Sequence, residues 1–200
     1  GDEVPAAAAV AARERVLKAP PSWGGDARTP IRVVLGPQAD YFDDDAIARF
    51  LAEPWIVSAA ADRMGVRLEG ARPLAHRADK GTEIVSDATV PGSIQVPGAG
   101  QPIVLLADAQ TAGGYPKIAT VVSADLPRLA ARRPGATIHF AAVDAAAAER
   151  LSRARARELD RLLAGIAVLA GEGVDLDALY RSNLVDGVVN ALQPDEFPRG

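Results

Sequence analysis

The sequence predicts a mainly β fold with flanking helices, and two observations carry this prediction. Short apolar or alternating runs recur about every ten residues with Pro, Gly and Asp between them, which is typical of a β-barrel or a β-sandwich. These runs are not separated by long helical segments, which argues against a doubly wound α/β sheet. We therefore expect an N-terminal helix or linker at residues 1–30, a β-region at 31–143 and a helical extension at 144–200.

The strands of the central region are predicted from β-branched and alternating segments. Within residues 64–68, Val66 and Leu68 point to one face and Arg67 to the other, as in a half-buried strand. The continuous apolar run 102–107 indicates a strand that is buried on both faces. The expected strands are residues 31–35, 55–58, 64–68, 82–86, 93–96, 102–107, 118–122 and 137–143, with a turn at 87–92.

The helices are predicted from capping residues and from helix-forming composition. Acidic residues fill the first turn after Asp43 and Pro54 ends that helix, while Asp144 caps a long helix rich in Ala, Glu and Arg. The arginines of the long helix are interleaved with acidic residues, which indicates a solvated, ion-paired face rather than a nucleic-acid patch. The expected helices are residues 5–17, 43–51, 126–133, 144–169 and 175–192.

Composition and charge argue against several classes of function. The chain has no cysteine, which removes disulfides, thiolate metal sites and cysteine nucleophiles. Its two histidines do not have HxH or HExxH spacing, so we expect no metal site. A net charge of −4 argues against nucleic-acid binding. No apolar run reaches about 18 residues, so we expect no membrane span and a cytoplasmic protein.

The strongest candidate site is the loop 108–117, which lies between two predicted strands. Polar groups on a loop that a rigid sheet holds commonly form binding sites. The loop carries a cation, a carboxylate, an amide, two hydroxyls and two glycines at close spacing, and it does not match GxxxxGK[ST]. These residues are Asp108, Gln110, Thr111, Gly113, Gly114, Tyr115 and Lys117.

The side chains of this loop suit a small anionic or amide ligand. Lys117 can neutralise a carboxylate or a phosphate, while Asp108 and Gln110 can orient an amide or a bicarbonate-like group. Adjacent glycines permit a positive φ and let a ligand approach the backbone closely. The alternative, a tight glycine hairpin with incidental polar residues, stays open from the spacing alone. We assign catalytic roles to Lys117, Asp108 and Tyr115, and ligand-binding roles to Gln110, Thr111, Gly113 and Gly114.

Three further residues are weaker candidates for ligand binding, namely Arg63, His76 and Arg77. Arg63 follows Asp62 in a bend, where a ligand clamp and a local salt bridge are the two alternatives. His76 and Arg77 precede more charged residues, as in a polar cleft or in a solvated loop. His139 lies within an apolar strand, and we expect it to be a packed or hydrogen-bonded core residue.

Four segments carry a resemblance to a known family: GPQADYF, SAAADRMGVRLEG, GTEIVSDATVPGSIQVPGAGQPIVLLADAQTAGGYPKIATVVSADLPRL and RPGATIHF. They resemble the biotin-dependent carboxyltransferase family, which includes the C subunit of 5-oxoprolinase, allophanate hydrolase subunit 2 and the carboxyltransferase part of urea carboxylase. The resemblance covers roughly residues 31–169 and implies a cyclophilin-like β-barrel at 31–143. Family members also carry an N-terminal half with a TTVQDLGRxG-type segment, which has no counterpart here, so we expect Gly1 to be an internal start.

The activity that the resemblance implies is that of the 5-oxoprolinase C subunit, a member of a hetero-oligomeric complex that hydrolyses 5-oxoproline to glutamate and uses ATP. The implied partner is a homologous protein, the 5-oxoprolinase B subunit or allophanate hydrolase subunit 1, with the small-molecule site near the interface. One alternative is a carboxyltransferase subunit of the urea amidolyase or allophanate hydrolase type. The chain lacks an AMKM-like lysine motif, so another protein would carry the biotin. An alternative of another class is a non-catalytic regulatory partner of a kinase-inhibitor protein.

Overall fold

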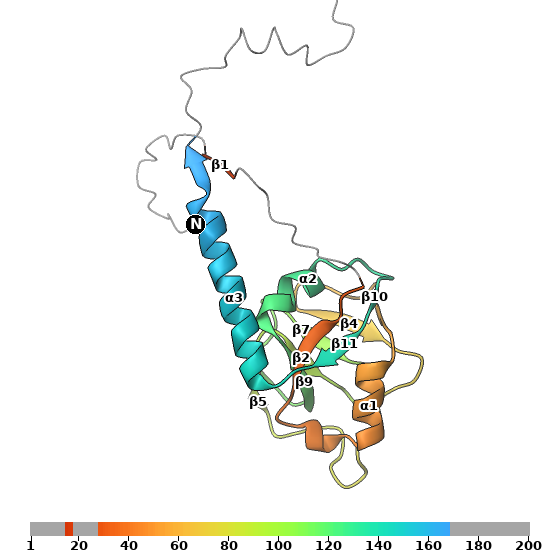
Figure 1. The fold of residues 1–200 in the computed structure, drawn as a ribbon. Coiled ribbons are helices and arrows are strands. Elements are labelled where there is room, and N and C mark those ends of the chain that lie inside the picture. Colours follow the sequence, from red (N-terminus) through yellow and green to blue (C-terminus); the bar gives the residue numbers. More distant parts are fainter. Residues whose placement is uncertain (1–14, 18–27, 169–200) are drawn as a thin grey trace, which may run out of the picture. The chain divides into compact units, whose positions relative to one another are not determined.

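A computed structural model of the protein describes residues 15–17 and 28–168 (Figure 1). The described part is mainly β, as predicted, with a nearly closed barrel-like sheet and flanking helices. The strands are β1 (Arg15–Leu17), β2 (Ile31–Leu35), β3 (Trp55–Val57), β4 (Gly65–Glu69), β5 (Asp87–Ala88), β6 (Ser93–Gln95), β7 (Ile103–Leu105), β8 (Ala112–Gly113), β9 (Lys117–Val121), β10 (Thr137–Ile138), β11 (Phe140–Ala142) and β12 (Ile166–Val168). The helices are α1 (Asp44–Ala52), α2 (Leu126–Ala130) and α3 (Ala145–Ala164), with short 3-10 helices η1 (Ala39–Tyr41) and η2 (Ser123–Asp125).

Eight strands form one sheet in the order β10–β3–β4–β7–β6–β9–β2–β11. Neighbouring strands are antiparallel except β2 and β11, which run parallel. The two outermost strands, β10 and β11, are consecutive in the chain and only His139 separates them. One extended segment therefore pairs with both ends of the sheet and nearly closes it into a barrel.

The apolar core fills the interior of this barrel, and each of the eight strands contributes residues to it. Val66 and Leu68 of β4 are buried, whereas Arg67 between them is exposed, so the predicted alternation is confirmed. The indole N–H of Trp55 donates a hydrogen bond to the carbonyl oxygen of Phe50 at 2.9 Å, so this buried ring has no unsatisfied polar group. The remaining outward positions of the strands are free to carry polar side chains.

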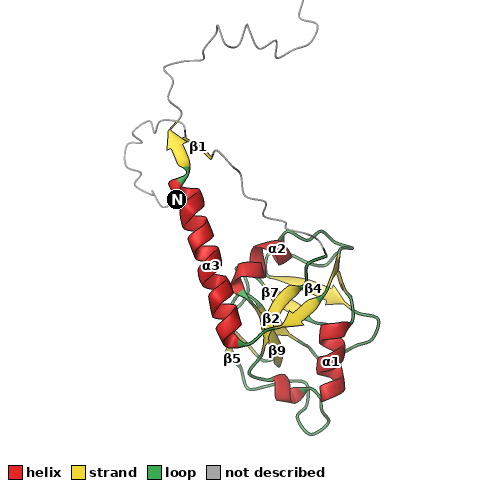
Figure 2. Ribbon diagram, viewed as in Figure 1, coloured by secondary structure: helices red, strands yellow, loops and turns green. Residues whose placement is uncertain are grey.

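Two of the predicted helix starts are confirmed by their caps. Asp43 accepts a backbone N–H hydrogen bond at 2.7 Å ahead of α1, and Asp144 accepts one at 2.6 Å ahead of α3. Phe50 of α1 stacks on Phe140 of β11, with ring centroids 4.6 Å apart, which fixes α1 on the barrel. Figure 2 shows α1 and α2 at the periphery of the strands. Among the residues described, no helix combines the length and the apolarity that a membrane crossing needs.

The long helix α3 carries the ion-paired face that the sequence predicted. Nη2 of Arg153 lies 2.5 Å from Oε1 of Glu149, and Nη1 of Arg155 lies 2.7 Å from Oε2 of Glu158. No described side chain of α3 is fully buried. The helix ends at Ala164, before the predicted residue 169, because a glycine follows and the next three residues form β12.

Several predictions of local structure were wrong. Residues 82–86 do not form the expected strand. The strand of this region is β5, which lies inside the turn predicted at 87–92, because these residues are the ones that pair with β8. The segment 137–143 is split into β10 and β11 at His139, whose side chain is exposed rather than part of the core. Arg15–Leu17 form a strand rather than the end of a helix. The rest of the helix predicted at 5–17, and the helix predicted at 175–192, lie outside the described residues.

The strands β1 and β12 form a separate antiparallel pair, with Arg15 opposite Val168 and Leu17 opposite Ile166. Among the described residues, 15–17 and 165–168 belong to one unit and 28–164, which contain the barrel and α3, to another.

Candidate functional site

The outer face of the barrel sheet carries a row of side chains from four neighbouring strands. Strand register places Arg67 of β4 opposite Ile103 of β7, Ile103 opposite Gln95 of β6, and Gln95 opposite Lys117 of β9. Their neighbours along the strands belong to the core, so these four side chains point away from it. The row therefore joins two cations and an amide across one patch of the sheet.

A cavity of about 170 Å³ lies over part of this row. Its lining combines the apolar Met64, Gly65, Ile103 and Leu105 with the polar Asp62, Arg67, Gln95, Gln110 and Tyr115. Pockets for drug-sized ligands measure about 300–1,000 Å³, so this cavity suits a smaller molecule.

Gln95 faces the cavity with only 2% of its surface exposed. Its Oε1 accepts a hydrogen bond from Nε2 of Gln110 at 3.3 Å. Its own Nε2 is buried and has no hydrogen-bond partner among the described residues. Gly113 permits this position of the amide, because a Cβ atom there would lie 2.5 Å from that nitrogen. The cavity is therefore lined by a buried amide that keeps a free donor, which is rare in folded proteins.

Lys117 lies at the end of the same row, and the protein itself neutralises its ammonium group. Its side chain is 4% exposed, and Nζ lies 2.7 Å from Oδ2 of Asp87. Gln38 joins this pair, since its Nε2 donates to Asp87 at 3.2 Å and its Oε1 accepts the backbone N–H of Lys117 at 3.3 Å. The hydrogen bond from Lys117 lowers the pKa of Asp87 below its ordinary value. Lys117 thus contacts a carboxylate of β5 and is not among the residues that line the cavity.

The loop that follows β7 is fastened to the segment before β6 by backbone hydrogen bonds. The N–H of Thr89 donates to the carbonyl oxygen of Thr111 at 2.9 Å, and the N–H of Ile84 donates to that of Gly114 at 2.8 Å. The Thr89 hydroxyl also donates to the carbonyl oxygen of Gln110. These contacts position Gln110 and Tyr115 over the sheet.

The two glycines of this loop differ in what they require. Neither Gly113 nor Gly114 has a positive φ, so the backbone freedom that the sequence suggested is not used here. Gly113 leaves room for the Gln95 amide, whereas a Cβ at Gly114 would meet its nearest atom, the carbonyl oxygen of Ile84, at an ordinary 3.4 Å. Only Gly113 is therefore required by close packing.

Asp108 and Arg63 pair with each other near a different cavity. Nε of Arg63 lies 3.5 Å from Oδ2 of Asp108, and both side chains are exposed. They border an open, mainly apolar cavity of about 360 Å³ together with Pro91, Leu106, Ala107, Leu126, Pro127 and Ala130. The neighbouring Asp62 does not pair with Arg63, because its Oδ1 accepts the backbone N–H groups of Met64 and Gly65 at 2.8 and 3.1 Å.

His76 and Arg77 make local contacts and line neither cavity. Nε2 of His76 lies 3.0 Å from the carbonyl oxygen of Val96, and its ring centroid is 4.9 Å from that of Phe42. Arg77 forms two hydrogen bonds with Asp79, at 2.9 and 3.0 Å. Within the described ranges, no three His, Asp or Glu side chains gather as a metal ion would require.

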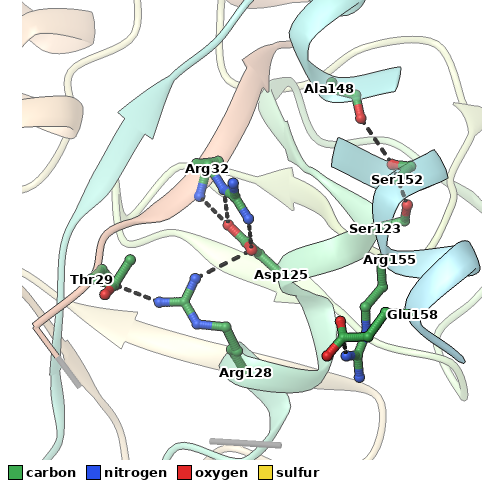
Figure 3. A network of polar contacts seen from close by, with 9 residues as sticks. All are labelled: Thr29, Arg32, Ser123, Asp125, Arg128, Ala148, Ser152, Arg155 and Glu158. Atoms are coloured by element: carbon green, nitrogen blue, oxygen red, sulfur yellow. Dashed lines mark hydrogen bonds and ion pairs between the residues drawn. The ribbon is translucent and has the colours of Figure 1, made fainter. Parts of the chain in front are cut away.

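A second polar cluster connects β2, η2 and α2 (Figure 3). Oδ2 of Asp125 accepts the backbone N–H and Nε of Arg32 at 2.9 and 2.8 Å, and Oδ1 lies 2.5 Å from Nη2 of Arg32 and 3.2 Å from Nη1 of Arg128. Arg128 also donates to the carbonyl oxygen of Thr29 at 2.6 Å. Burial alone would raise the pKa of Asp125, but these hydrogen bonds and the two positive charges outweigh burial and lower it. Both carboxylate oxygens are satisfied, so this cluster is a structural network.

Of the predicted site residues, the structure thus brings Gln110 and Tyr115 together at the cavity over the row, places Gly113 against the Gln95 amide, and places the others elsewhere. Sequence reasoning did not identify Gln95, and it treated Arg67 only as an outward-facing strand residue. The available signal for Gln95 was its amide between Ile94 and Val96, at the end of a strand that breakers follow. Its alignment with Arg67 depends on strand register, which one sequence does not reveal.

Comparisons with known proteins give relatives for most of the chain. Residues 1–142 match the family model described as carboxyltransferase domain, subdomain A and B. The chain is 43% identical over 118 residues to the C subunit of 5-oxoprolinase from Escherichia coli, covering 59% of this chain and 36% of that protein. It is 41% identical over 147 residues to the C subunit of 5-oxoprolinase from Haemophilus influenzae, covering 69% and 45%. The solved structure of K. lactis urea amidolyase aligns with a TM-score of 0.63 and 26% identity, covering 68% of this chain and 9% of that one.

Proposed function

Because this chain belongs to the carboxyltransferase domain, subdomain A and B, family, we propose that it is part of a 5-oxoprolinase, a complex that hydrolyses 5-oxoproline to glutamate and uses ATP. One observation carries the proposal: the chain is 41–43% identical to two proteins named as the C subunit of 5-oxoprolinase, against 26% for the urea amidolyase structure. The word subunit in those names implies a multi-chain assembly, so this chain acts with partners.

The cavity over the outer row supports this proposal chemically. Opening a cyclic amide requires groups that hold the amide and stabilise the negative charge that develops on its carbonyl oxygen. The free amide donor of Gln95 and the guanidinium of Arg67 can each donate to an oxygen atom, and Tyr115 borders the same cavity. Lys117 and its partner Asp87 do not line this cavity, so the proposal gives Lys117 no contact with the substrate.

The chain spans less than half the length of the two curated relatives, so the proposal gives it a part of the reaction rather than all of it. ATP is assigned to the complex, since the sequence contains no GxxxxGK[ST] segment. The proposed partner is a homologous protein of the same type as the B subunit of 5-oxoprolinase, which completes the active site.

A second candidate function is carboxyl transfer of the urea amidolyase type, which the likeness to the K. lactis structure favours. In that case biotin would arrive on another protein, because this sequence has no AMKM-like lysine motif. The amide-binding groups of the cavity would then hold urea or its carboxylated product.

The experiment that decides between these functions is reconstitution with the partner subunits. The assembled complex should release glutamate from 5-oxoproline with matched hydrolysis of ATP, and a complex that lacks this chain should not. Urea with bicarbonate and a biotin carrier is the parallel assay for the second candidate. Turnover that persists without this chain would contradict a catalytic role and would favour a regulatory partner instead.

A further inference from the structure

The unpaired Nε2 of Gln95 points to a ligand that carries a hydrogen-bond acceptor. A buried amide donor that lacks a partner destabilises the fold, because its hydrogen bond to water has been lost without replacement. The neighbouring Gln110 does not satisfy this donor. The one hydrogen bond between the two amides runs from Nε2 of Gln110 to Oε1 of Gln95, so Nε2 of Gln95 stays without a partner among the described residues. The missing partner is an acceptor, such as the carbonyl oxygen of an amide.

Arg67 supplies a second anchor on the other side of the cavity. It lies in the same row as Gln95 with Ile103 between them, and no ion pair of its guanidinium is found among the described residues. Two strand spacings separate Arg67 from Gln95, or about 10 Å between their Cα atoms. Both side chains line the same cavity, so their polar ends can contact two groups of one small molecule. A planar guanidinium suits a carboxylate, which it binds through two parallel hydrogen bonds.

The rest of the lining fixes the orientation of such a molecule. Met64, Gly65, Ile103 and Leu105 supply apolar lining for a hydrocarbon ring or chain. Among the described residues that line the cavity, Arg67 is the only cation, so the carboxylate of a ligand is assigned to Arg67 and its carbonyl group to Gln95.

We propose that the cavity between Arg67 and Gln95 binds a small amide that bears a carboxylate, with Gln95 Nε2 donating to the amide carbonyl and Arg67 pairing with the carboxylate. The inference deepens the proposed function, on which the choice of 5-oxoproline as the ligand rests. Gln95 and Arg67 then determine specificity: one selects the amide and the other selects the acid.

The test is equilibrium binding to the full chain, alone and with the partner protein, using three probes. 5-Oxoproline has both groups, 2-pyrrolidinone has the cyclic amide without the carboxylate, and proline has the carboxylate without the amide carbonyl. Arg67→Met should weaken 5-oxoproline binding by about 10- to 100-fold, the range for a hydrogen-bonded charge, and leave 2-pyrrolidinone unchanged. Gln95→Met should weaken 5-oxoproline and 2-pyrrolidinone by about 5- to 10-fold and leave proline unchanged.

Arg63→Met is the matched control, because Arg63 is an exposed arginine that borders the other cavity. The inference is overturned if no probe binds either preparation, or if Arg67→Met and Arg63→Met change binding equally. The outcomes also separate the two proposals. Turnover of 5-oxoproline with unchanged KM in Arg67→Met and Gln95→Met would refute this site and leave the proposed function standing. Probe binding with the predicted pattern, without turnover in the reconstituted complex, would support the site and refute the proposed function.

Discussion

The cluster around Asp125 and the amide of Gln95 are two buried polar sites that the same barrel treats in opposite ways. Asp125 is 1% exposed in its side chain, and both of its oxygens are occupied by arginine and backbone donors. Gln95 is equally buried, but one of its two polar atoms has no partner among the described residues. The satisfied carboxylate of Asp125 therefore stabilises the fold, whereas Gln95 keeps a hydrogen-bond donor free.

The largest loss of stability is expected when the Asp125 cluster loses its carboxylate in Asp125→Ala. Removing the carboxylate leaves Arg32 and Arg128 without their acceptor, and we expect a loss of about 3 kcal/mol in the free energy of unfolding. This is the low end of the range for a broken buried pair, because the Arg32 side chain is 31% exposed and can hydrate. Chemical denaturation measures it, with Arg153→Ala on the exposed pair of α3 as a control that should lose less than about 0.5 kcal/mol. Equal losses in both variants would show that the cluster is not a structural network.

Acid should weaken the Asp125 cluster by a smaller amount, because a protonated carboxyl group still fills its place. The pKa of Asp125 is lower in the folded protein than its ordinary value of 3.8. Its stabilising contribution is therefore complete above that value and is lost as the pH falls through the lower, folded-state pKa. Denaturation from about pH 5 to pH 1 should show a stability slope that Asp125→Asn flattens. If the free energy of unfolding depends on pH equally in Asp125→Asn and in the parent protein, other carboxylates cause the acid sensitivity.

At the other site, Gly113→Ala and Gly114→Ala should differ from each other. A methyl group at Gly113 pushes the Gln95 amide into the cavity, while Gly114 has ordinary space. We expect Gly113→Ala to lose about 1 kcal/mol of stability, as overpacking against a movable side chain does, and to lose ligand binding as well. Gly114→Ala should stay within about 0.5 kcal/mol of the parent protein, because no positive φ is involved. Thermal melting and probe binding measure both variants in parallel. A larger loss in Gly114→Ala than in Gly113→Ala would contradict the prediction.

The smallest change in stability is expected for Gln95→Met, which separates the two sites most sharply. Methionine removes the unsatisfied donor and fills a similar volume, and the exposed Gln110 can turn to water for its lost partner. The free energy of unfolding should change by less than about 1 kcal/mol, in either direction. A loss near that of Asp125→Ala would mean that Gln95 is a structural residue after all.

The sequence predicted those features whose causes lie within a few residues. Asp43 caps α1 through the N–H of Ala46, three positions away, and the alternation of β4 follows from strand geometry alone. The type of most core strands and the mainly β class were therefore predictable, and the family resemblance added the barrel.

The parts of the site that were missed depend on distant contacts. The predicted catalytic charge of Lys117 meets Asp87, which lies 30 residues away in a segment expected to be a turn. The role of Gly113 depends on Gln95, a residue of another strand, and not on its own backbone angles. Such placements are decided by register and packing between strands, for which one sequence contains no direct signal.

The segment that closes the barrel also decides when the barrel can form. β10 pairs with β3, and β11 pairs with β2, so two strands that precede the rest of the sheet in the chain wait for residues that follow it. Until then, the nascent chain exposes an unpaired edge on β2 and another on β3, each a template for association with a second chain. Because such closing contacts are far apart in sequence, folding is expected to be slow, and chains interrupted before residue 137 should aggregate rather than persist as partial barrels.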